Sequence, residues 1–419
     1  MATICIHSVG SLGDFNPFLL LAKELLKEGH SVRFATLSIY KDQLESIGVQ
    51  FCSVRPDLGP IDRDLAEKVM DPYKGFDNVF EVFFVPIRQT YEDLNAVCEG
   101  ADLLITGSLA YAGLLVHKSR NIPWISLAFQ PALFISDYEF PVLPQVPWLR
   151  FFLSRSVGAV RIVKKMFRWK IDRKSQAWFS LLSELGISQD TNILFEGPYS
   201  PDLQIAAYSP VLSPRQPDWP AHRHHTGFIQ PSPKALSLSS ELEKFLQNGE
   251  PPIVFTLGSA AILMGEAFFD ITIEVLRITK ARAVLVCGDL VQRVQAKGRD
   301  LPQVYVTGPE PYSALFPRAR ILVHQGGAGT TGEALRAGTP MVVVPFGQDQ
   351  YDNAWHIEKM GCGVWCPMNS LSVSKLLKLL KQVDQESIRE ASHKISERLQ
   401  TENGLAQMVT YVKKMLTQP

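Results

Sequence analysis

The segment HQGGAGTTGEAL, residues 324–335, joins a strand-like apolar run to a helix-like stretch through a glycine-rich turn. The first amides of a helix lack intrahelical partners and carry roughly half a positive charge, and glycine lets an anion approach them closely. The segment therefore predicts a phosphate-binding site, with a ligand-free tight turn as the alternative. Its glycines are Gly326, Gly327, Gly329 and Gly332.

Polar residues follow the next strand-like run, residues 341–347, at what should be the same edge of the sheet. Asp349 and Gln350 offer acceptors and donors suited to sugar hydroxyl groups, although a surface turn is the simpler interpretation. Thr330 and Glu333 have the spacing of a T-x-x-E capping box and predict that the helix starts at GEALRAG.

A second candidate for chemistry is Asp14, in GSLGDFNP after the strand-like residues 3–8. A carboxylate accepts a proton usefully only when it is held close to the nucleophile or when burial raises its pKa. The alternative is that Asp14 caps the following helix. Asn16 and Pro17 fit the N-cap and first helical positions, which favours Asp14 as a base. His7, inside the strand, is predicted to be a core histidine.

Two series of strands and helices must position these residues, and a Pro- and Ser-rich stretch near residues 209–252 separates them. Such alternation predicts α/β domains with parallel sheets, which bind ligands at the carboxyl ends of the strands. Two doubly wound domains facing each other across a cleft are therefore expected. The predicted strands are residues 3–8, 31–36, 101–108, 122–128, 253–259, 282–289, 304–308, 319–325 and 341–347.

Composition limits the function. The chain has 419 residues, is 46% hydrophobic, and carries 42 basic and 42 acidic side chains, so no overall charge favours nucleic acid. The N-terminal residues do not resemble a signal peptide, and no apolar run approaches the ~18 residues of a membrane span. Six scattered cysteines indicate reduced thiols in a cytoplasmic protein.

Residues 324–350, HQGGAGTTGEALRAGTPMVVVPFGQDQ, resemble the donor signature of the family 1 nucleotide-sugar glycosyltransferases. The similarity is greatest to the bacterial branch near the sterol, rhamnolipid and antibiotic-aglycone enzymes. Residues 10–36 resemble the opening of the acceptor domain in the same group. The resemblance implies a GT-B fold and an inverting reaction without a tightly bound metal or cofactor. The implied units are residues 1–212 for the acceptor, 213–250 as linker, 251–400 for the donor, and 401–419 as a C-terminal helix returning to the first domain.

The resemblance also implies a role for each matching residue. Asp14 would be the catalytic base, Glu333 would bind the donor ribose, and Asp349 with Gln350 would hold the sugar hydroxyls. Gln325 stands where the family commonly has a phosphate-binding histidine, so the diphosphate would rely on backbone amides and His324 could be a buried strand residue. The implied diphosphate contacts are Ser259, His324, Gln325, Gly327, Ala328, Gly329 and Thr330.

The expected activity is transfer of a hexose, with UDP-glucose as the first candidate donor and a dTDP-sugar as the second. The acceptor would be a hydroxyl group of a small lipophilic molecule such as a sterol, polyphenol, carotenoid or lipid-like aglycone. Thr307 occupies the position of a tryptophan that stacks on uracil in plant members, which leaves the nucleotide open. The alternatives are a non-catalytic lipid or ligand carrier and a GT-B nucleotide-sugar epimerase. A nicotinamide oxidoreductase is disfavoured because GSLGDF lacks the G-x-G-x-x-G pattern.

Residues 148–174 contain nine basic residues and one acidic residue among apolar and aromatic ones. This pattern is typical of an amphipathic helix at a membrane surface, and it predicts peripheral contact with the inner membrane face. An arm over the acceptor site with a solvated basic face is the alternative. The acceptor pocket is expected between residues 60–95 and 135–180. His222, His224 and His225 are assigned to the linker, not to a metal site.

Overall fold

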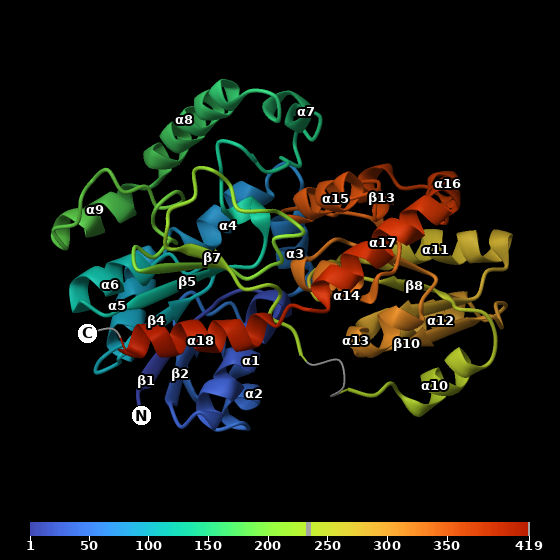
Figure 1. The fold of residues 1–419 in the computed structure, drawn as a ribbon, viewed down its shortest axis with the longest axis horizontal. Coiled ribbons are helices and arrows are strands. Elements are labelled where there is room, and N and C mark those ends of the chain that lie inside the picture. The colour runs from blue at the N-terminus through green and yellow to red at the C-terminus, as the bar shows by residue number, and fades with distance from the viewer. Residues whose placement is uncertain (232–235, 418–419) are drawn as a thin grey trace.

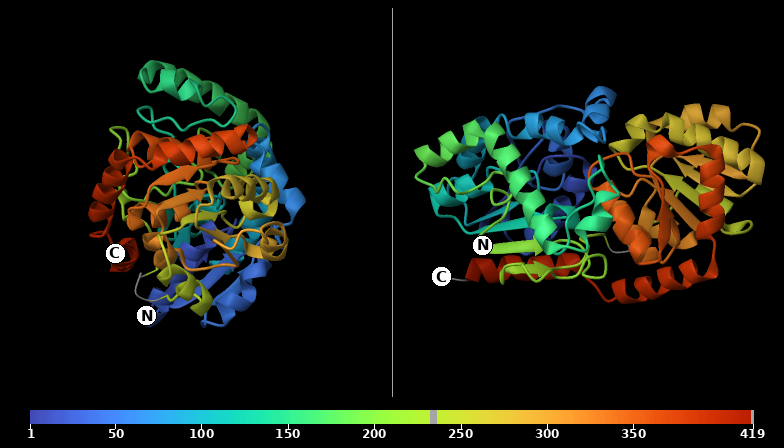
Figure 2. Two further views of the ribbon diagram at one scale, coloured as in Figure 1. Left: turned by 90° about the vertical axis from the view of Figure 1, so that its right-hand side faces the viewer. Right: turned by 90° about the horizontal axis from the view of Figure 1, so that it is seen from above.

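The computed structural model describes residues 1–231 and 236–417. Two domains lie side by side along the long axis of the molecule, and each has a parallel sheet with helices around it (Figures 1 and 2). The predicted α/β architecture of two doubly wound domains is confirmed.

The first sheet has seven parallel strands in the order β3-β2-β1-β4-β5-β6-β7. Central β1 pairs with β2 on one side and β4 on the other, so that Ile6 lies opposite Phe34 and Ile105. Apolar side chains fill both faces of these strands, as expected for a sheet covered by helices. The strands are β1 (Thr3–His7), β2 (Ser31–Thr36), β3 (Gln50–Ser53), β4 (Leu103–Thr106), β5 (Trp124–Ala128), β6 (Leu203–Ala206) and β7 (Arg223–His225).

Three strands of this sheet, β3, β6 and β7, were not predicted. Strand β7 lies within residues 213–250, the segment assigned to the linker, and it pairs in parallel with β6. The first domain therefore continues beyond residue 212, and the histidines of RHH are part of an edge strand.

The second sheet has six parallel strands in the order β10-β9-β8-β11-β12-β13. This order repeats that of the first six strands of the other sheet. In each sheet the chain first adds strands toward one edge and then crosses over and adds strands toward the other edge. This switch lies between β1 and β4 in the first sheet and between β8 and β11 in the second. Doubly wound folds bind ligands at such switch points. The strands are β8 (Ile253–Thr256), β9 (Ala283–Val286), β10 (Val304–Thr307), β11 (Ile321–His324), β12 (Met341–Val343) and β13 (Gly363–Trp365).

Helices cover both sheets. Those of the first domain are α1 (Leu12–Lys27), α2 (Lys41–Glu45), α3 (Arg63–Met70), α4 (Gly75–Phe83), α5 (Ile87–Val97), α6 (Gly113–Arg120), α7 (Leu149–Leu153), α8 (Val157–Lys174) and α9 (Gln176–Glu184). Those that follow are α10 (Ser240–Gln247), α11 (Glu266–Thr279), α12 (Val291–Lys297), α13 (Tyr312–Leu315), α14 (Ala328–Ala337), α15 (Gln350–Lys359), α16 (Val373–Val383), α17 (Glu386–Leu399) and α18 (Gly404–Thr417). In the described ranges, none of these helices combines the length and the apolar character needed to cross a bilayer.

The last helix, α18, packs against the first domain. Helix α18 lies along α1 (Figure 1), its Met408 and Val412 are buried in the same core as the first sheet, and Lys413 Nζ is 2.7 Å from Glu28 Oε2. The two domains are thus joined by the returning helix α18 as well as by the chain segment between β7 and α10.

Candidate active site

Asp14 lies just after β1, at the switch point of the first sheet. Helix α1 begins at Leu12, with Ser11 as its N-cap, and Asp14 completes a capping box by accepting a hydrogen bond from Ser11 N to Oδ2 at 3.0 Å. The predicted start at Asn16 and Pro17 is wrong, because Ser11 and Asp14 satisfy the free amides one turn earlier and Pro17 falls inside the helix. Asp14 therefore does cap the helix.

Capping leaves one oxygen of Asp14 free. The backbone N and the Oγ of Ser11 both donate to Oδ2, and within the described chain Oδ1 has no hydrogen bond and is not sealed from solvent. Burial of the carboxyl group raises the pKa of Asp14 to about 6, and the hydrogen bonds from Ser11 oppose that shift only in part. Capping and proton acceptance are compatible in this geometry.

Gly10 makes room for this carboxylate. Its φ is +127°, and a Cβ there would lie 2.4 Å from Asp14 Oδ2. His7, further back in β1, is fully buried; burial lowers its pKa to about 4, and its Nδ1 lies 3.0 Å from Ala35 O. His7 is a neutral core residue, as the sequence indicates.

The glycine-rich turn joins β11 to α14 at the switch point of the second sheet. Gly326 has φ +88°, and a Cβ there would lie 2.7 Å from Val343 Cγ1, so the sharp turn needs glycine. Helix α14 starts at Ala328 with Gly327 as N-cap. Thr330 and Glu333 lie inside the helix, so the predicted capping box is wrong: the turn at Gly326 starts the helix earlier.

This helix start leaves three amides free. The first intrahelical bond runs from Thr331 N to Gly327 O at 2.8 Å, and the amides of Ala328, Gly329 and Thr330 have no partner among the described residues. A Cβ on Gly329 would meet nothing within 4 Å, which leaves open space beside them. Gly332 serves packing instead, because a Cβ there would lie 2.7 Å from Phe228 Cδ1.

Gln325 lies between the two loops at the switch point. A Cβ added to Gly258 would lie 2.3 Å from Gln325 Nε2, and one added to Gly327 would lie 2.7 Å from the same atom. The side-chain amide of Gln325 therefore packs against both the end of β8 and the start of α14. Gln325 is 3% exposed, and its Oε1 has no partner among the described residues. Ser259, next to Gly258, is exposed on the same edge.

His324 is fully buried at the end of β11. Its Nδ1 accepts a hydrogen bond from Gly326 N at 3.1 Å, and burial lowers its pKa to about 3, so it is neutral. In this position it supports the glycine turn as a strand-end residue, which is the alternative that its sequence position left open.

Asp349 and Gln350 follow β12 beside the glycine turn. Burial is the main reason that the pKa of Asp349 rises to about 7, and the negative charge of Asp14 is the next contribution. The Oε1 of Gln350 accepts hydrogen bonds from Phe346 N at 2.8 Å and Gly347 N at 3.3 Å, so this side chain shapes the loop.

Asn353 was missed by the sequence analysis. This fully buried side chain donates through Nδ2 to Gly326 O at 2.8 Å and to Asp349 Oδ2 at 3.0 Å, so it joins the glycine turn to the predicted sugar-binding residue. Its position four residues after Asp349 in a helix was the available signal. Glu333, one turn into α14, is half-buried, and burial raises its pKa to about 7 against the opposing charge of Arg336.

The loop before α15 also contacts the first domain at the end of α3. Gln348 donates a hydrogen bond to Val69 O, and Gln350 Nε2 lies 3.7 Å from Met70 Sδ. A Cβ on Gly347 would lie 2.3 Å from Met70 O. These contacts place the loop that holds Asp349 and Gln350 at the domain junction, and the charge of Asp14 in the first domain contributes to the raised pKa of Asp349.

An apolar cavity of about 140 Å³ lies in the first domain. It is bounded by α4 and by the junction of α8 and α9, so both segments expected to form the acceptor pocket contribute to it. Its lining includes Phe80, Phe84, Val85, Lys174, Trp178 and Ile193.

Two models of known protein families match separate parts of the chain. Residues 4–132 match the glycosyltransferase family 28 N-terminal domain. Residues 286–415 match the erythromycin biosynthesis protein CIII-like C-terminal domain.

The curated relatives of this chain include enzymes of two kinds. The chain is 26% identical over 385 residues to a sterol 3-beta-glucosyltransferase from Leptosphaeria maculans, covering 88% of this chain but only 26% of that protein. It is 26% identical over 386 residues to the O-mycaminosyltylonolide 6-deoxyallosyltransferase of Streptomyces fradiae, covering 85% and 84%. The chain thus spans about a quarter of the sterol enzyme it matches.

A solved structure with this fold is that of the glycosyltransferase VinC in complex with dTDP. It aligns with a TM-score of 0.67 and 19% identity over 99% of both chains. The two matched domain models, the curated relatives and the strand order shared by the two sheets all indicate a glycosyltransferase with two similar α/β domains. This chain belongs to the family 1 glycosyltransferases of GT-B fold.

Proposed function

We propose that this protein transfers a hexose from a nucleotide diphosphate sugar to a hydroxyl group of a small lipophilic acceptor, with inversion at the anomeric carbon. The observation that carries the proposal is the contact between the two domains at the loop that holds Asp349, where Gln348 donates to Val69 O and Gly347 lies against Met70. The charge of Asp14 also contributes to the raised pKa of Asp349, which supports a site that takes a proton acceptor from one domain and a carboxyl group for the sugar from the other.

In the proposed reaction, Asp14 Oδ1 takes the proton of the acceptor hydroxyl. The hydroxyl oxygen forms a bond to the anomeric carbon from the side opposite the nucleotide. The bond from that carbon to the diphosphate oxygen breaks, and its electron pair leaves with the nucleotide diphosphate. The raised pKa of Asp14 favours proton acceptance over that of an ordinary carboxylate.

The free amides of Ala328, Gly329 and Thr330 face the charge that develops on the leaving diphosphate. Fixed donors at a helix N-terminus stabilise such charge without reorganisation during the reaction. Gln325 and Ser259 are proposed to complete this site from the neighbouring loop, and Glu333 to accept hydrogen bonds from the ribose. The dTDP bound by VinC supports a thymidine or uridine nucleotide.

The acceptor is proposed to bind in the first domain, against the aromatic cavity between α4 and the α8–α9 junction. The sterol enzymes among the relatives support a lipophilic alcohol of this kind, and the macrolide enzyme supports a bulky aglycone. Glucose is the first candidate sugar, since the sterol relatives transfer it by name.

A direct assay tests this proposal. The full chain is incubated with UDP-glucose or a dTDP-sugar and a panel of sterols, phenols and macrolide aglycones, and products are detected by mass. We expect a hexose adduct with at least one acceptor and slow donor hydrolysis without acceptor. A protein that binds acceptors yet neither transfers nor hydrolyses either donor would be a carrier.

The sugar role of Asp349 has its own test. In Asp349→Ala, we expect loss of affinity for the nucleotide sugar with little change for the free nucleotide diphosphate, because only the sugar contacts this carboxyl group. Isothermal titration calorimetry with both ligands measures the difference. Equal weakening of both ligands would assign Asp349 to the shape of the loop through Asn353 instead of to the sugar.

A further inference from the structure

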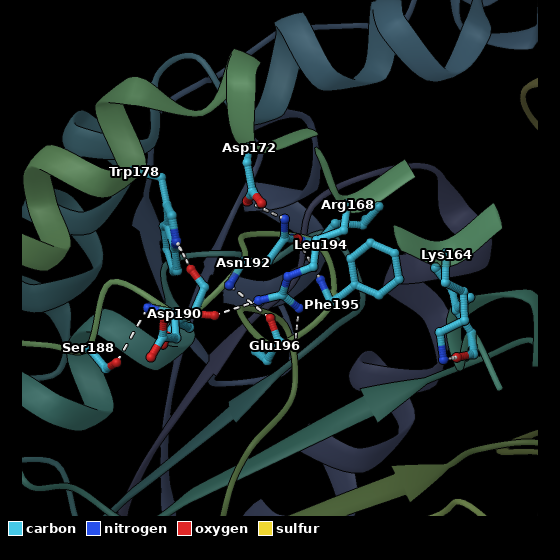
Figure 3. A network of polar contacts seen from close by, with 12 residues as sticks. Lys164, Arg168, Asp172, Trp178, Ser188, Asp190, Asn192, Leu194, Phe195 and Glu196 are labelled. Carbon is cyan, nitrogen blue, oxygen red and sulfur yellow. Dashed lines mark hydrogen bonds and ion pairs between the residues drawn. The ribbon is translucent and has the colours of Figure 1, made fainter. Parts of the chain in front are cut away.

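One face of α8 is fixed to the first domain by charge pairs. Arg161 and Lys164 contact Asp137 at 2.8 Å and 2.7 Å, and Lys174 contacts Asp77 at 2.9 Å. Arg168 donates to Glu196 at 2.6 Å within a network that reaches Asn192 and Trp178 (Figure 3). These cations hold the helix in place, so they do not explain its outer face.

The outer face of α8 carries large apolar side chains that contact water. Ile162, Met166 and Trp169 are 62%, 66% and 61% exposed, and their spacing places them on one side of the helix. Burying them would be favourable, and clusters of this kind on a surface usually mark a site of contact.

Helix α7 adds three exposed aromatic side chains at the same outer edge of the molecule (Figures 1 and 2). Trp148, Phe151 and Phe152 are 64%, 60% and 58% exposed, and Phe152 contacts both others edge-to-face. They pack on one another instead of on the domain. We call these six side chains, with Arg155, Lys165 and Arg173, the outer patch.

The three cations of the outer patch differ from those of the inner face. Arg155 lies 3.4 Å from the centre of the Phe151 ring, and Arg173 lies 4.8 Å from that of Trp169. Lys165 is exposed on the same side of α8. None of the three contacts an acidic side chain in the part of the chain that the structure describes.

Aromatic rings beside unpaired cations match the chemistry of a bilayer surface. Trp and Phe enter the boundary between headgroups and acyl chains, while Lys and Arg reach the phosphates of anionic lipids. Self-association through a two-fold axis would instead bring these cations toward their own copies, which is unfavourable.

We propose that the outer patch docks this protein on the surface of a bilayer that contains anionic lipid. The docking goes beyond the proposed transfer reaction and does not depend on it, because the outer patch includes none of the residues assigned to donor or base. The aromatic side chains enter the interface, and Arg155, Lys165 and Arg173 pair with lipid phosphates.

Flotation of the full chain, without any nucleotide sugar, tests the proposal. The vesicles are phosphatidylcholine alone, or phosphatidylcholine mixed with phosphatidylglycerol. We expect the wild type to float with the anionic vesicles and to be released by salt. If each cation contributes about fivefold, Lys165→Gln with Arg173→Gln lowers binding about 25-fold. Met166→Ser with Trp169→Ser is expected to lower it about tenfold or more.

Matched controls use similar residues elsewhere. Lys378 and Lys381 of α16 are exposed cations, and Ile278 of α11 is an apolar side chain with 62% exposure. Lys378→Gln with Lys381→Gln, and Ile278→Ser, should bind as the wild type does. Thermal unfolding checks that every variant is folded.

Three results would overturn the proposal. The first is a wild type that floats with neither kind of vesicle. The second is that the outer-patch variants cannot be distinguished from the controls, either because they bind as the wild type does or because the control variants lose as much binding. The third is a wild type that sediments as a dimer and becomes monomeric in the Met166→Ser and Trp169→Ser variant, since the patch would then bind a second copy.

Discussion

At the scale of single residues, the candidate site is defined by three carboxyl groups whose pKa values burial raises. The values are about 6 for Asp14 and about 7 for Asp349 and Glu333. Asp14 combines a raised pKa with a fixed orientation, because hydrogen bonds from Ser11 hold one of its oxygens and leave the other free. That combination suits a general base, which must be positioned before its proton affinity matters.

Asp14→Asn tests this role. The asparagine oxygen still accepts the hydrogen bond from Ser11 N, so the start of α1 is preserved while the proton acceptor is lost. We expect kcat to fall about 10²- to 10⁴-fold, with an unchanged Kd for the nucleotide diphosphate. Steady-state kinetics and calorimetry measure the two quantities. Wild-type turnover in this variant would reassign the base.

The same carboxyl group predicts a pH dependence. Only ionised Asp14 accepts a proton, so kcat/KM for the acceptor should fall tenfold per pH unit below an apparent pKa of about 6 and level off above it. Rates at a fixed concentration of donor from pH 5 to pH 8, about one unit below and two units above the pKa of about 6, give the profile. In Asp14→Asn the limb near pH 6 should disappear; its persistence would assign it to another group.

Residue types, motif spacing and the family resemblance suggested most residues of this candidate site but not the contacts between them. Asp14, Asp349 and the glycine turn were recognised from motif spacing, whereas Asn353 was overlooked because a single asparagine in a helix is usually unremarkable. The hydrogen bonds of Gln350 to its own loop follow from the backbone path, which no local pattern contains. The sequence could suggest roles, and only the fold could show which side chains support one another.

At the scale of elements, long apolar runs predicted their strands well, and short ones escaped. β7 has the sequence RHH and β13 has GVW, each three residues long, so neither shows alternation. They are strands because β6 and β12 offer them a free edge to pair with. The helix starts at Ser11 and Gly327 were misplaced for a related reason, since competing capping residues stood nearby.

Alanine substitutions at two glycines of the turn distinguish a role in protein stability from a role in ligand binding. Gly326→Ala should lower the free energy of unfolding by about 2 kcal/mol or more, because the residue would need positive φ and would clash with Val343. Gly329→Ala meets no neighbour and should raise it by up to about 1 kcal/mol, since alanine favours a helix.

Urea unfolding measures both stabilities, and titration with UDP or dTDP measures the ligand role. We expect Gly329→Ala to weaken diphosphate binding although the protein is at least as stable as before, because the methyl group occupies the open space beside the free amides. If Gly329→Ala binds the nucleotide as the wild type does, the phosphates lie elsewhere.

At the scale of the whole molecule, the two domains meet through buried polar contacts as well as through α18. Asp352 of α15 is 2% exposed and accepts a hydrogen bond from Val142 N of the first domain at 2.9 Å. Burial alone would raise the pKa of Asp352, but His356, whose Nε2 lies 3.5 Å from Asp352 Oδ2, and the charge of Arg150 outweigh burial and hold the pKa below its ordinary value. Arg150, itself buried, stacks on Trp355 at 4.1 Å.

Asp352 therefore provides the last prediction, on the stability of the domain junction. Asp352→Ala leaves Val142 N without its acceptor in a buried site and removes a negative charge that stabilises the buried cation of Arg150, and it should cost about 2–4 kcal/mol in the free energy of unfolding. Asp352→Asn keeps an acceptor for Val142 N and should lose about half as much. Because folding lowers this pKa, the wild type gains stability from ionised Asp352 above the unfolded pKa of about 4 and loses it as pH falls through the folded value. Urea unfolding at neutral pH and in acid should thus show the gap between wild type and Asp352→Asn closing on acidification. A gap that stays constant with pH would mean that the charge of Asp352 does not hold the domains together, and that shape alone joins them.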